Sequence, residues 1–185
     1  MAKAVQIKKG NAIKLDGELW RVVDIQQTFT GKHGAYQQMK LANVNDGHVE
    51  TRRFASGDNV EKAFLTTETL QYLYQDGPSY VFMDEETGEQ IHVGADLLTD
   101  ILPYMAYNCD VDLQMYEGKP ITASIASSVV LEVTHTEPAA RGDTATAVTK
   151  PAELETGLTI KVPGHIKIGD KVSVDTRTGE FLGRA

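Results

Sequence analysis

A single lysine, Lys32, lies between two glycines in the segment Thr30-Gly31-Lys32-His33-Gly34. Its side chain is a flexible cation that can brace a polar or anionic partner. With a pKa depressed by burial or by cationic neighbours, it could instead act as an amine nucleophile. Glycines beside it supply positive φ and remove side-chain bulk, which lets such a loop enter a narrow space. A lysine in a loop of this kind is more commonly a solvated turn residue, so the rest of the chain must decide.

Strand-like segments on both sides position this lysine. Residues 19–25 read Leu-Trp-Arg-Val-Val-Asp-Ile, and residues 38–44 follow with polar and apolar residues alternating over 38–41. Two such segments joined by a glycine-bracketed tip are typical of a long β-hairpin. Lys32 is then predicted to be the furthest-projecting group of that hairpin.

Turn signals such as Asp16-Gly17, Asp46-Gly47 and Thr178-Gly179 recur along the chain, with short β-rich segments between them. This pattern is typical of an all-β protein made of small barrels rather than of alternating strands and helices. We therefore predict three domains. They are a five-stranded SH3-like barrel over residues 1–64, an oligonucleotide-binding-type (OB) barrel over 65–126, and a second small five-stranded barrel over 127–185.

One short helix is expected inside the second domain. Apolar residues recur there at helical spacing, and Pro103 limits the length of the helix; they are Leu97, Leu98, Ile101, Leu102 and Met105. We expect this stripe to pack in the core of the barrel rather than to form a cofactor site.

Charge is distributed unevenly along the chain. The net charge of −8 disfavours a general nucleic-acid binder held by phosphate attraction. Residues 1–64 carry +3, residues 65–126 carry −10 and residues 127–185 carry −1. The middle third should avoid phosphates while the first third can tolerate them, which favours oriented docking on a partner.

Several classes of protein are disfavoured by the absence of their signals. The sequence has no run of 18 apolar residues and no signal-peptide pattern, so we expect no membrane partner and a cytoplasmic location. Cys109 is the only cysteine, which excludes an internal disulfide and a cysteine-based zinc site. The five histidines show no metal-binding spacing, and no nucleotide or nucleophile motif occurs. We therefore predict a recognition protein with no catalytic residue, metal or cofactor.

The strongest family signal lies in the last third of the chain and consists of Lys150-Pro151-Ala152, Gly157, Ile160, Val162-Pro163, Ile166 and Gly169. Further agreement comes from Gly142-Asp143-Thr144, from Tyr72-Leu73-Tyr74 with Asp76-Gly77, and from residues 174–180. On these residues the chain resembles the bacterial translation elongation factor P family over essentially its full length.

This resemblance implies an L-shaped arrangement of a KOW-type SH3-like barrel and two OB barrels. It implies a monomer that binds the ribosome, both subunits included, between the peptidyl and exit sites. There it would position peptidyl-tRNA and relieve stalling at consecutive prolines. Lys32 would reach the peptidyl-transferase centre on a tip loop of Thr30, Gly31, His33 and Gly34. The implied ribosome or tRNA contacts elsewhere are Arg141, Gly142, Asp143, Thr144, Phe181 and Arg184, with Phe181 in place of a more usual tyrosine.

The tip also departs from the commonest pattern of that family, Pro-Gly-Lys-Gly. Here it is closer to the hypusine loop of the eukaryotic and archaeal relative, initiation factor 5A. In the family, the residue at the position of Lys32 is often extended covalently by a modifying enzyme. β-Lysylation, another extension or bare lysine therefore stay open for Lys32, while arginine-directed rhamnosylation is excluded because no arginine stands there.

Three other interpretations stay open. The elongation factor P-like paralogue would share the fold, but its loop commonly carries arginine where this chain has Lys32. A generic OB module acting on free RNA is disfavoured by the acidic second domain. An enzyme using Lys32 as a nucleophile needs a depressed lysine pKa, which an exposed hairpin tip does not suggest.

Overall fold

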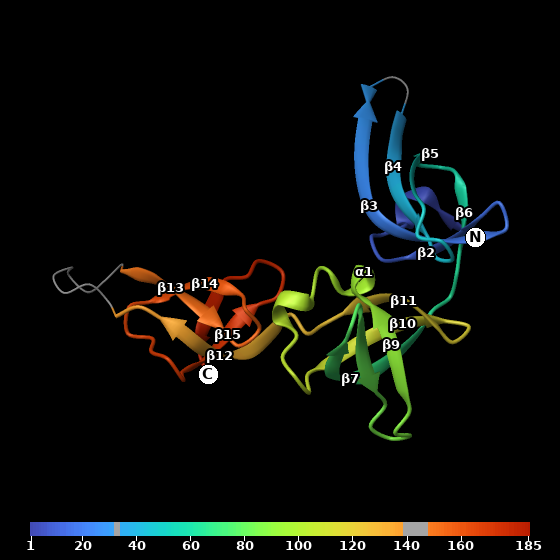
Figure 1. Ribbon diagram of the computed structural model, residues 1–185. Helices are drawn as coiled ribbons and strands as arrows, with labels where there is room; N and C mark the ends of the chain where they lie inside the picture. The colour runs from blue at the N-terminus through green and yellow to red at the C-terminus, as the bar shows by residue number, and fades with distance from the viewer. Residues whose placement is uncertain (32–33, 139–147) are drawn as a thin grey trace. The chain divides into compact units, whose positions relative to one another are not determined.

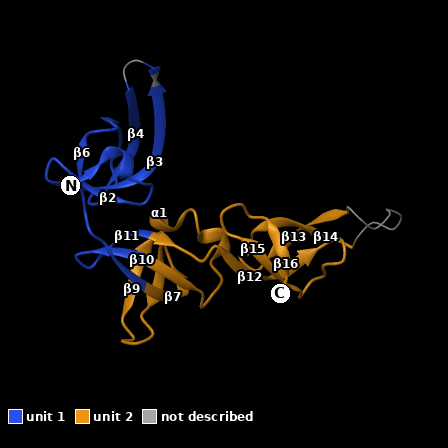
Figure 2. Ribbon diagram, turned by 180° about the vertical axis from the view of Figure 1, so that it is seen from behind, with its two compact units in different colours: residues 1–68, 113–122 blue, residues 69–112, 123–185 orange. Residues whose placement is uncertain are grey.

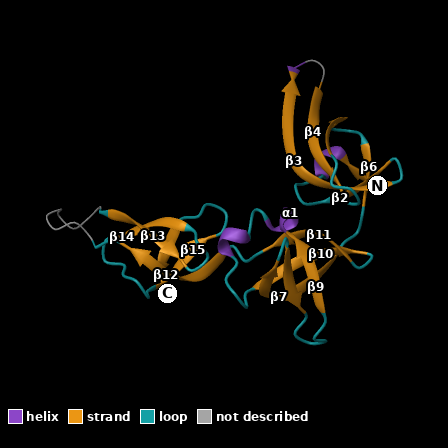
Figure 3. Ribbon diagram, in the orientation of Figure 1, coloured by secondary structure: helices purple, strands orange, loops and turns teal. Residues whose placement is uncertain are grey.

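A computed structural model describes residues 1–31, 34–138 and 148–185, and nearly all of its regular structure is β-strand (Figures 1 and 3). The strands form three separate sheets, of six, five and five strands in chain order. The prediction of an all-β protein built from three small β-units is confirmed.

The first sheet has the order β1-β6-β2-β3-β4-β5. Its interior is filled by apolar side chains that include Ile13, Trp20, Met39 and Leu41, each at most 4% exposed. The five predicted strands are joined by a sixth, β1, which has only two residues and so leaves no alternating pattern in the sequence. The elements are β1 (Ala2–Lys3), the 3₁₀ helix η1 (Ala4–Gln6), β2 (Ala12–Leu15), β3 (Glu18–Thr30), β4 (Gly34–Asn43), β5 (Val49–Ala55) and β6 (Asn59–Lys62).

The second sheet has the order β11-β10-β7-β8-β9. Strand β8 lies between β7 and β9, and its Val81 and Phe82 are fully enclosed. The predicted turn at Asp76-Gly77 joins β7 to β8, and Gly77 has φ +57°, a conformation that favours glycine. The strands are β7 (Thr66–Asp76), β8 (Ser79–Met83), β9 (Gln90–Gly94), β10 (Asp110–Tyr116) and β11 (Lys119–Ser124).

The prediction of a single helix near residue 100 is wrong, because two short helices occur there. The segment contains a one-turn helix α1 (Ala95–Leu98) and a separate 3₁₀ helix η3 (Leu102–Tyr104). Pro103 has no N–H to continue an α-helical ladder, and the chain closes instead with i→i−3 bonds such as Tyr104 N–H to Ile101 O at 2.9 Å. The expected core role does hold for Leu98, Ile101 and Met105, which are buried.

The third sheet has the order β14-β13-β12-β15-β16, which confirms the five strands predicted there. Several residues of the family signature belong to its core, since Ala152, Ile160, Val162 and Ile166 are all 5% exposed or less. These four residues of the signature therefore pack in the core of the third barrel. Its strands are β12 (Ser128–Thr136), β13 (Thr149–Leu154), β14 (Thr159–Pro163), β15 (Lys171–Asp175) and β16 (Phe181–Arg184).

The chain divides into two compact units (Figure 2). The first contains residues 1–68 with 113–122, and the second contains residues 69–112 with 123–185. The domain boundaries expected after residues 64 and 126 stay a prediction. Among the residues that the structure describes, no helix has the length and apolar character needed to cross a membrane.

Candidate functional site

The candidate site is the β3–β4 hairpin of the first unit, which extends past the other strands of its sheet (Figure 1). Its ladder contains ten residue pairs, from Trp20 opposite Asn43 to Thr30 opposite Gly34, with an irregularity between Val22 and Asp24. The predicted hairpin is therefore confirmed up to its tip. Lys32 and His33 lie outside the described residues, and the roles expected for them stay predictions.

The two glycines that bracket the tip have left-handed backbone conformations. Gly34 has φ +83° and Gly31 has φ +21°. A Cβ added at either position would meet nothing within 4 Å, so the need for glycine comes from the backbone rather than from crowding. The conformational reason for glycine inferred from the sequence is thus present in the structure.

Strand β5 supports β4 almost to the tip. The ladder between them ends at Tyr36 opposite Ala55, and beyond it the backbone N–H and the Oγ of Ser56 both donate to the Ala35 carbonyl, at 3.1 and 2.8 Å. Strand β4 therefore has hydrogen-bonded neighbours on both edges as far as Ala35. This bracing fixes the base from which the tip loop starts.

One face of the hairpin gathers polar and cationic side chains near the tip. The guanidinium of Arg53 on β5 lies over the ring of Tyr36, 3.5 Å from its centroid. Register and strand alternation place Gln26, Gln38 and Thr28 on the same face. None of these five side chains is acidic, so the face can contact phosphate and sugar groups. Sequence reasoning missed Arg53, although its neighbour in the ladder is Gln38 of the predicted partner strand.

The other face carries an exposed aromatic residue and a buried amide. Phe29, opposite Ala35, is 79% exposed, whereas Gln37 two residues further along β4 is 1% exposed. Both polar atoms of the Gln37 amide lack a hydrogen-bond partner among the described residues. Strand alternation is the sequence signal that separates Gln37 from its exposed neighbour Gln38, because it places Gln37 on the face of the buried Met39 and Leu41.

The C-terminal residues expected to face tRNA lie on β16. Phe181 is partly buried and packs against the core of the third barrel, opposite Val174. Arg184 is 61% exposed, and its Nη2 lies 2.9 Å from Oδ1 of Asp170. The loop expected to approach the small subunit, Arg141 to Thr144, lies outside the described residues. The contacts predicted for these six residues stay predictions.

Cys109, the one cysteine of the sequence, lies outside the hairpin. Burial, with Asp110 beside it, raises the pKa of the Cys109 thiol to about 11, so this group is protonated at neutral pH. Within residues 1–31, 34–138 and 148–185, no three His, Cys, Asp or Glu side chains are placed to hold a metal ion. The described residues of the hairpin and of β5 offer cationic, polar and exposed aromatic side chains, which are groups that can bind a partner.

Comparison with known families identifies each third of the chain. Residues 3–60 match the elongation factor P KOW-like domain, residues 65–123 match the elongation factor P OB domain, and residues 129–184 match the elongation factor P C-terminal domain. The predicted order of a KOW-type barrel followed by OB-type barrels agrees with these matches.

Curated relatives agree over the full length. Elongation factor P of Kocuria rhizophila is 45% identical over 184 residues, covering 100% of this chain and 98% of that protein. Elongation factor P of Salinispora tropica is 44% identical over 185 residues and covers 100% of both chains. Elongation factor P of Acidothermus cellulolyticus is 44% identical over 185 residues, covering 100% of this chain and 99% of that one.

Among solved structures, a eukaryotic translation initiation factor 5A from Methanococcus jannaschii matches with 16% identity and a TM-score of 0.41, covering 68% of this chain and 90% of that chain. The domain matches and the full-length relatives show the family. The resemblance inferred from the sequence is confirmed by both. This chain belongs to the elongation factor P family and is a translation factor with a role in elongation.

Proposed function

We propose that this protein binds the ribosome between the peptidyl and exit sites and stimulates peptide-bond formation at consecutive prolines. In this proposal the β3–β4 hairpin carries Lys32 to the CCA end of peptidyl-tRNA. The observation that carries it is the hairpin itself, which has a ten-pair ladder, glycines at both ends of the tip, and support from β5 as far as Ala35. Family membership supports the role in elongation.

The proposed mechanism is orientation without participation in bond making. Proline is a rigid and poor acceptor and donor, so consecutive prolines leave the reacting groups badly placed. Binding energy that holds the peptidyl-tRNA in a productive geometry offsets part of the entropic barrier to the reaction. A braced hairpin suits this task because a flexible arm would lose conformational entropy on binding. The Lys32 ammonium would contact the CCA end, and the glycines would permit close backbone approach.

The face around Arg53 and Tyr36 is the proposed contact with the acceptor arm of the tRNA. It combines a guanidinium, a ring and amide side chains, all of which can bind phosphate or sugar groups. We further propose that Phe181, Arg184 and the loop 141–144 contact the tRNA and the small subunit. The partners are therefore both ribosomal subunits and peptidyl-tRNA, and the protein acts as a monomer without an active site of its own.

Reconstituted translation of a Pro-Pro-Pro message tests the proposal. The protein purified from its native host should restore tripeptide yield, and Lys32→Ala should not. Lys40→Ala is the matched control, because Lys40 is an exposed lysine on β4 of the same hairpin. It lies opposite Asp24 in the ladder, away from the tip. Equal activity of Lys32→Ala and the unaltered protein would show that the tip argument is wrong. Failure of the unaltered protein would favour the paralogue or the free-RNA interpretation.

A covalent extension of Lys32 is the second element of the proposal. Intact and peptide mass spectrometry of protein from the native host should show added mass on the peptide that contains Lys32 and on no other lysine. A lysine-modifying enzyme of that host is then a partner. Bare Lys32 together with full translation activity would exclude a need for modification.

A further inference from the structure

A cavity of about 530 Å³ lies wholly within the second compact unit. Its lining includes three tyrosines, Tyr72, Tyr80 and Tyr107, together with residues 155–159, which are the turn after β13 and the first residue of β14. The volume falls in the range typical of small-molecule binding sites. The cavity belongs to the second unit, whereas the β3–β4 hairpin belongs to the first.

The walls of the cavity are tied to each other. Thr156 Oγ1 donates a hydrogen bond to the Pro103 carbonyl at 2.5 Å, which joins the β13–β14 turn to the 3₁₀ helix η3. Tyr104 of that helix and Ala106 just after it pack against the core of the third barrel, as does Leu158 of the turn. The cavity is therefore bounded by packed segments rather than by free loops.

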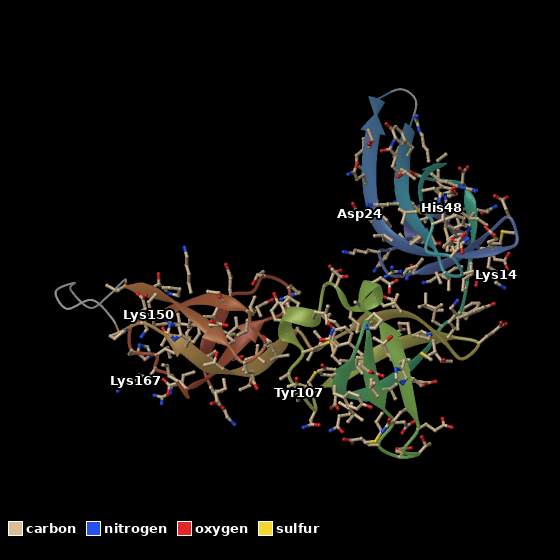
Figure 4. All side chains as sticks on the ribbon, in the orientation of Figure 1. Lys14, Asp24, His48, Tyr107, Lys150 and Lys167 are labelled. Atoms are coloured by element: carbon tan, nitrogen blue, oxygen red, sulfur yellow. The ribbon has the colours of Figure 1, made fainter. Side chains whose placement is uncertain are left out.

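Part of its lining is an aromatic stack. The rings of Tyr72 and Tyr107 are nearly parallel, with 5.7 Å between centroids and 12° between planes, and Tyr80 lies 5.9 Å from Tyr72. Tyr72 is buried while Tyr107, labelled in Figure 4, is 68% exposed, so a fixed inner ring supports an accessible outer one. Burial, aided by Tyr107 and Tyr80, raises the pKa of Tyr72, which keeps its ring neutral at physiological pH. Stacked tyrosine rings offer π faces that attract cations.

The charge around the cavity has one sign. Among the described residues that line the cavity, Glu155 is the one with a carboxylate side chain, and none is Lys or Arg. The Glu132 backbone N–H donates to Oε1 of Glu155 at 2.9 Å, which orients that carboxylate. Residues 65–126, which supply all three tyrosines, carry a net charge of −10. This negative charge repels phosphate groups and attracts cations.

The chain itself shows the same chemistry at other rings. Arg53 lies over Tyr36, Arg52 over Trp20 and Lys14 over Tyr116. In each case a cation of the chain covers an aromatic face. The tyrosine cavity offers equivalent faces and a carboxylate, while the described residues that line it supply no cation.

We propose that this cavity binds an arginine or lysine side chain of a basic polypeptide segment from a partner protein. The cationic head lies against Tyr107 and pairs with Glu155, and the methylene stem packs on the apolar lining at Met105 and Leu158. A polypeptide is chosen because the cavity is open and larger than one cationic head, so flanking backbone can be accommodated. The proposal does not rest on ribosome binding, and its test uses the isolated full chain.

Titration of tyrosine-labelled protein with short peptides tests this proposal by NMR of the ring resonances. The probe is acetyl-Gly-Gly-Arg-Gly-Arg-Gly-Gly-amide at about 150 mM salt, where weak surface attraction is screened. The Tyr107 and Tyr72 rings should shift and saturate, and the peptide with Gln in place of both Arg residues should leave them unchanged. Equal shifts with the Gln peptide would overturn the proposal.

Two matched pairs of variants separate the cavity from general acidity. Tyr107→Leu should weaken binding about three- to fivefold, whereas Tyr74→Leu should stay within about twofold, because Tyr74 is 47% exposed on β7 but does not line the cavity. Glu155→Gln should weaken binding by a similar factor, with Glu153→Gln, exposed two residues earlier on β13, as its control. The same affinity for Tyr107→Leu and the unaltered protein would overturn the proposal.

Competing ligands decide the class of occupant. Spermidine and a short RNA hairpin, each added to the preformed peptide complex, should leave the tyrosine shifts in place at concentrations equal to that of the peptide. Displacement by spermidine would assign the cavity to polyamines, and displacement by RNA would assign it to nucleic acid. Either result would overturn the assignment to a basic polypeptide segment.

Discussion

The guanidinium of Arg53 on β5 lies 3.5 Å from the centroid of the Tyr36 ring on β4. These residues are diagonal neighbours across the ladder, because Arg53 is opposite Gln38 and Tyr36 is opposite Ala55. Arg53 is exposed and Tyr36 is half-buried, so the stack holds a solvent-accessible cation over a ring that lies four residues from Lys32 in the sequence. A cation–π contact of this kind contributes about 0.5–2 kcal/mol.

Arg53→Gln is expected to reduce Pro-Pro-Pro tripeptide yield several-fold while leaving the fold intact, because it removes the cation from the proposed tRNA face. The measurement is reconstituted translation beside a urea unfolding curve for each protein. Arg177→Gln is the matched control, since Arg177 is 77% exposed in the last hairpin and pairs with Asp175 of its own turn. Unchanged yield for Arg53→Gln would remove this face from the proposed contact.

Gln37→Met is expected to stabilise the protein. The Gln37 side chain is 1% exposed, and its amide has no hydrogen-bond partner among the described residues. A buried polar group without a partner costs about 1–3 kcal/mol, and methionine has a similar length without the polar atoms. The free energy of unfolding in urea should rise by about 1 kcal/mol.

Gln38→Met is the control for that change, because Gln38 is the next residue on β4 and is exposed on the opposite face. Its effect should stay within about 0.5 kcal/mol. A loss of stability in Gln37→Met would mean that the buried amide does have a partner, and the explanation given for the site would then be wrong.

The fold could be predicted from the sequence wherever a local signal exists. Alternation over residues 38–41 and the glycines at 31 and 34 predict the hairpin because strand faces and positive φ leave direct marks on residue choice. The two-residue strand β1 leaves no such mark. The helix near Pro103 was mispredicted because apolar spacing records which side chains are buried, and both one α-helix and two short helices bury Leu98, Ile101 and Met105.

The candidate site was predictable only in part. Lys32 stands out because glycines flank it, but the Arg53–Tyr36 stack depends on the register between β4 and β5, which local sequence does not specify. The tyrosine cavity joins residues near positions 72, 107 and 155, and that contact arises only when η3 packs on the third barrel. Such long-range pairings carry no local periodicity.

Arg184→Gln is expected to lower translation activity with little loss of stability. The arginine is 61% exposed and pairs with Asp170 at 2.9 Å, and an ion pair with one exposed partner contributes about 1 kcal/mol or less. Asp170 keeps a second hydrogen bond, from the Lys167 backbone N–H to Oδ2 at 2.9 Å, so its carboxylate is not left unpaired.

Asp170→Asn separates a tRNA contact from a structural role for Arg184. It weakens the same ion pair but leaves the charge of Arg184 in place, so translation activity should be retained. Equal loss of activity in Asp170→Asn and Arg184→Gln would show that the ion pair itself matters, and would count against a direct contact between Arg184 and tRNA.

Cys109 should react with iodoacetamide far more slowly in the folded protein than in urea. Burial, followed by the charge of Asp110, raises its pKa from 9.0 to about 11, and only the thiolate reacts. At pH 8 the thiolate fraction in the folded state is then about 100-fold lower than in the unfolded chain. Because the folded pKa is the higher one, the stability from this group is complete below about pH 9 and is lost as the pH rises towards 11.

The alkylation rate measured from pH 7 to 11.5 gives the thiol pKa in each state. Asp110→Asn should lower the folded-state midpoint towards that of the unfolded chain, though not fully, since burial is the larger cause. The difference in unfolding free energy between the unaltered protein and Cys109→Ala should shrink between pH 9 and 11. A folded-state midpoint near 9 would show instead that the thiol is open to water, and that the segment joining η3 to β10 opens in solution.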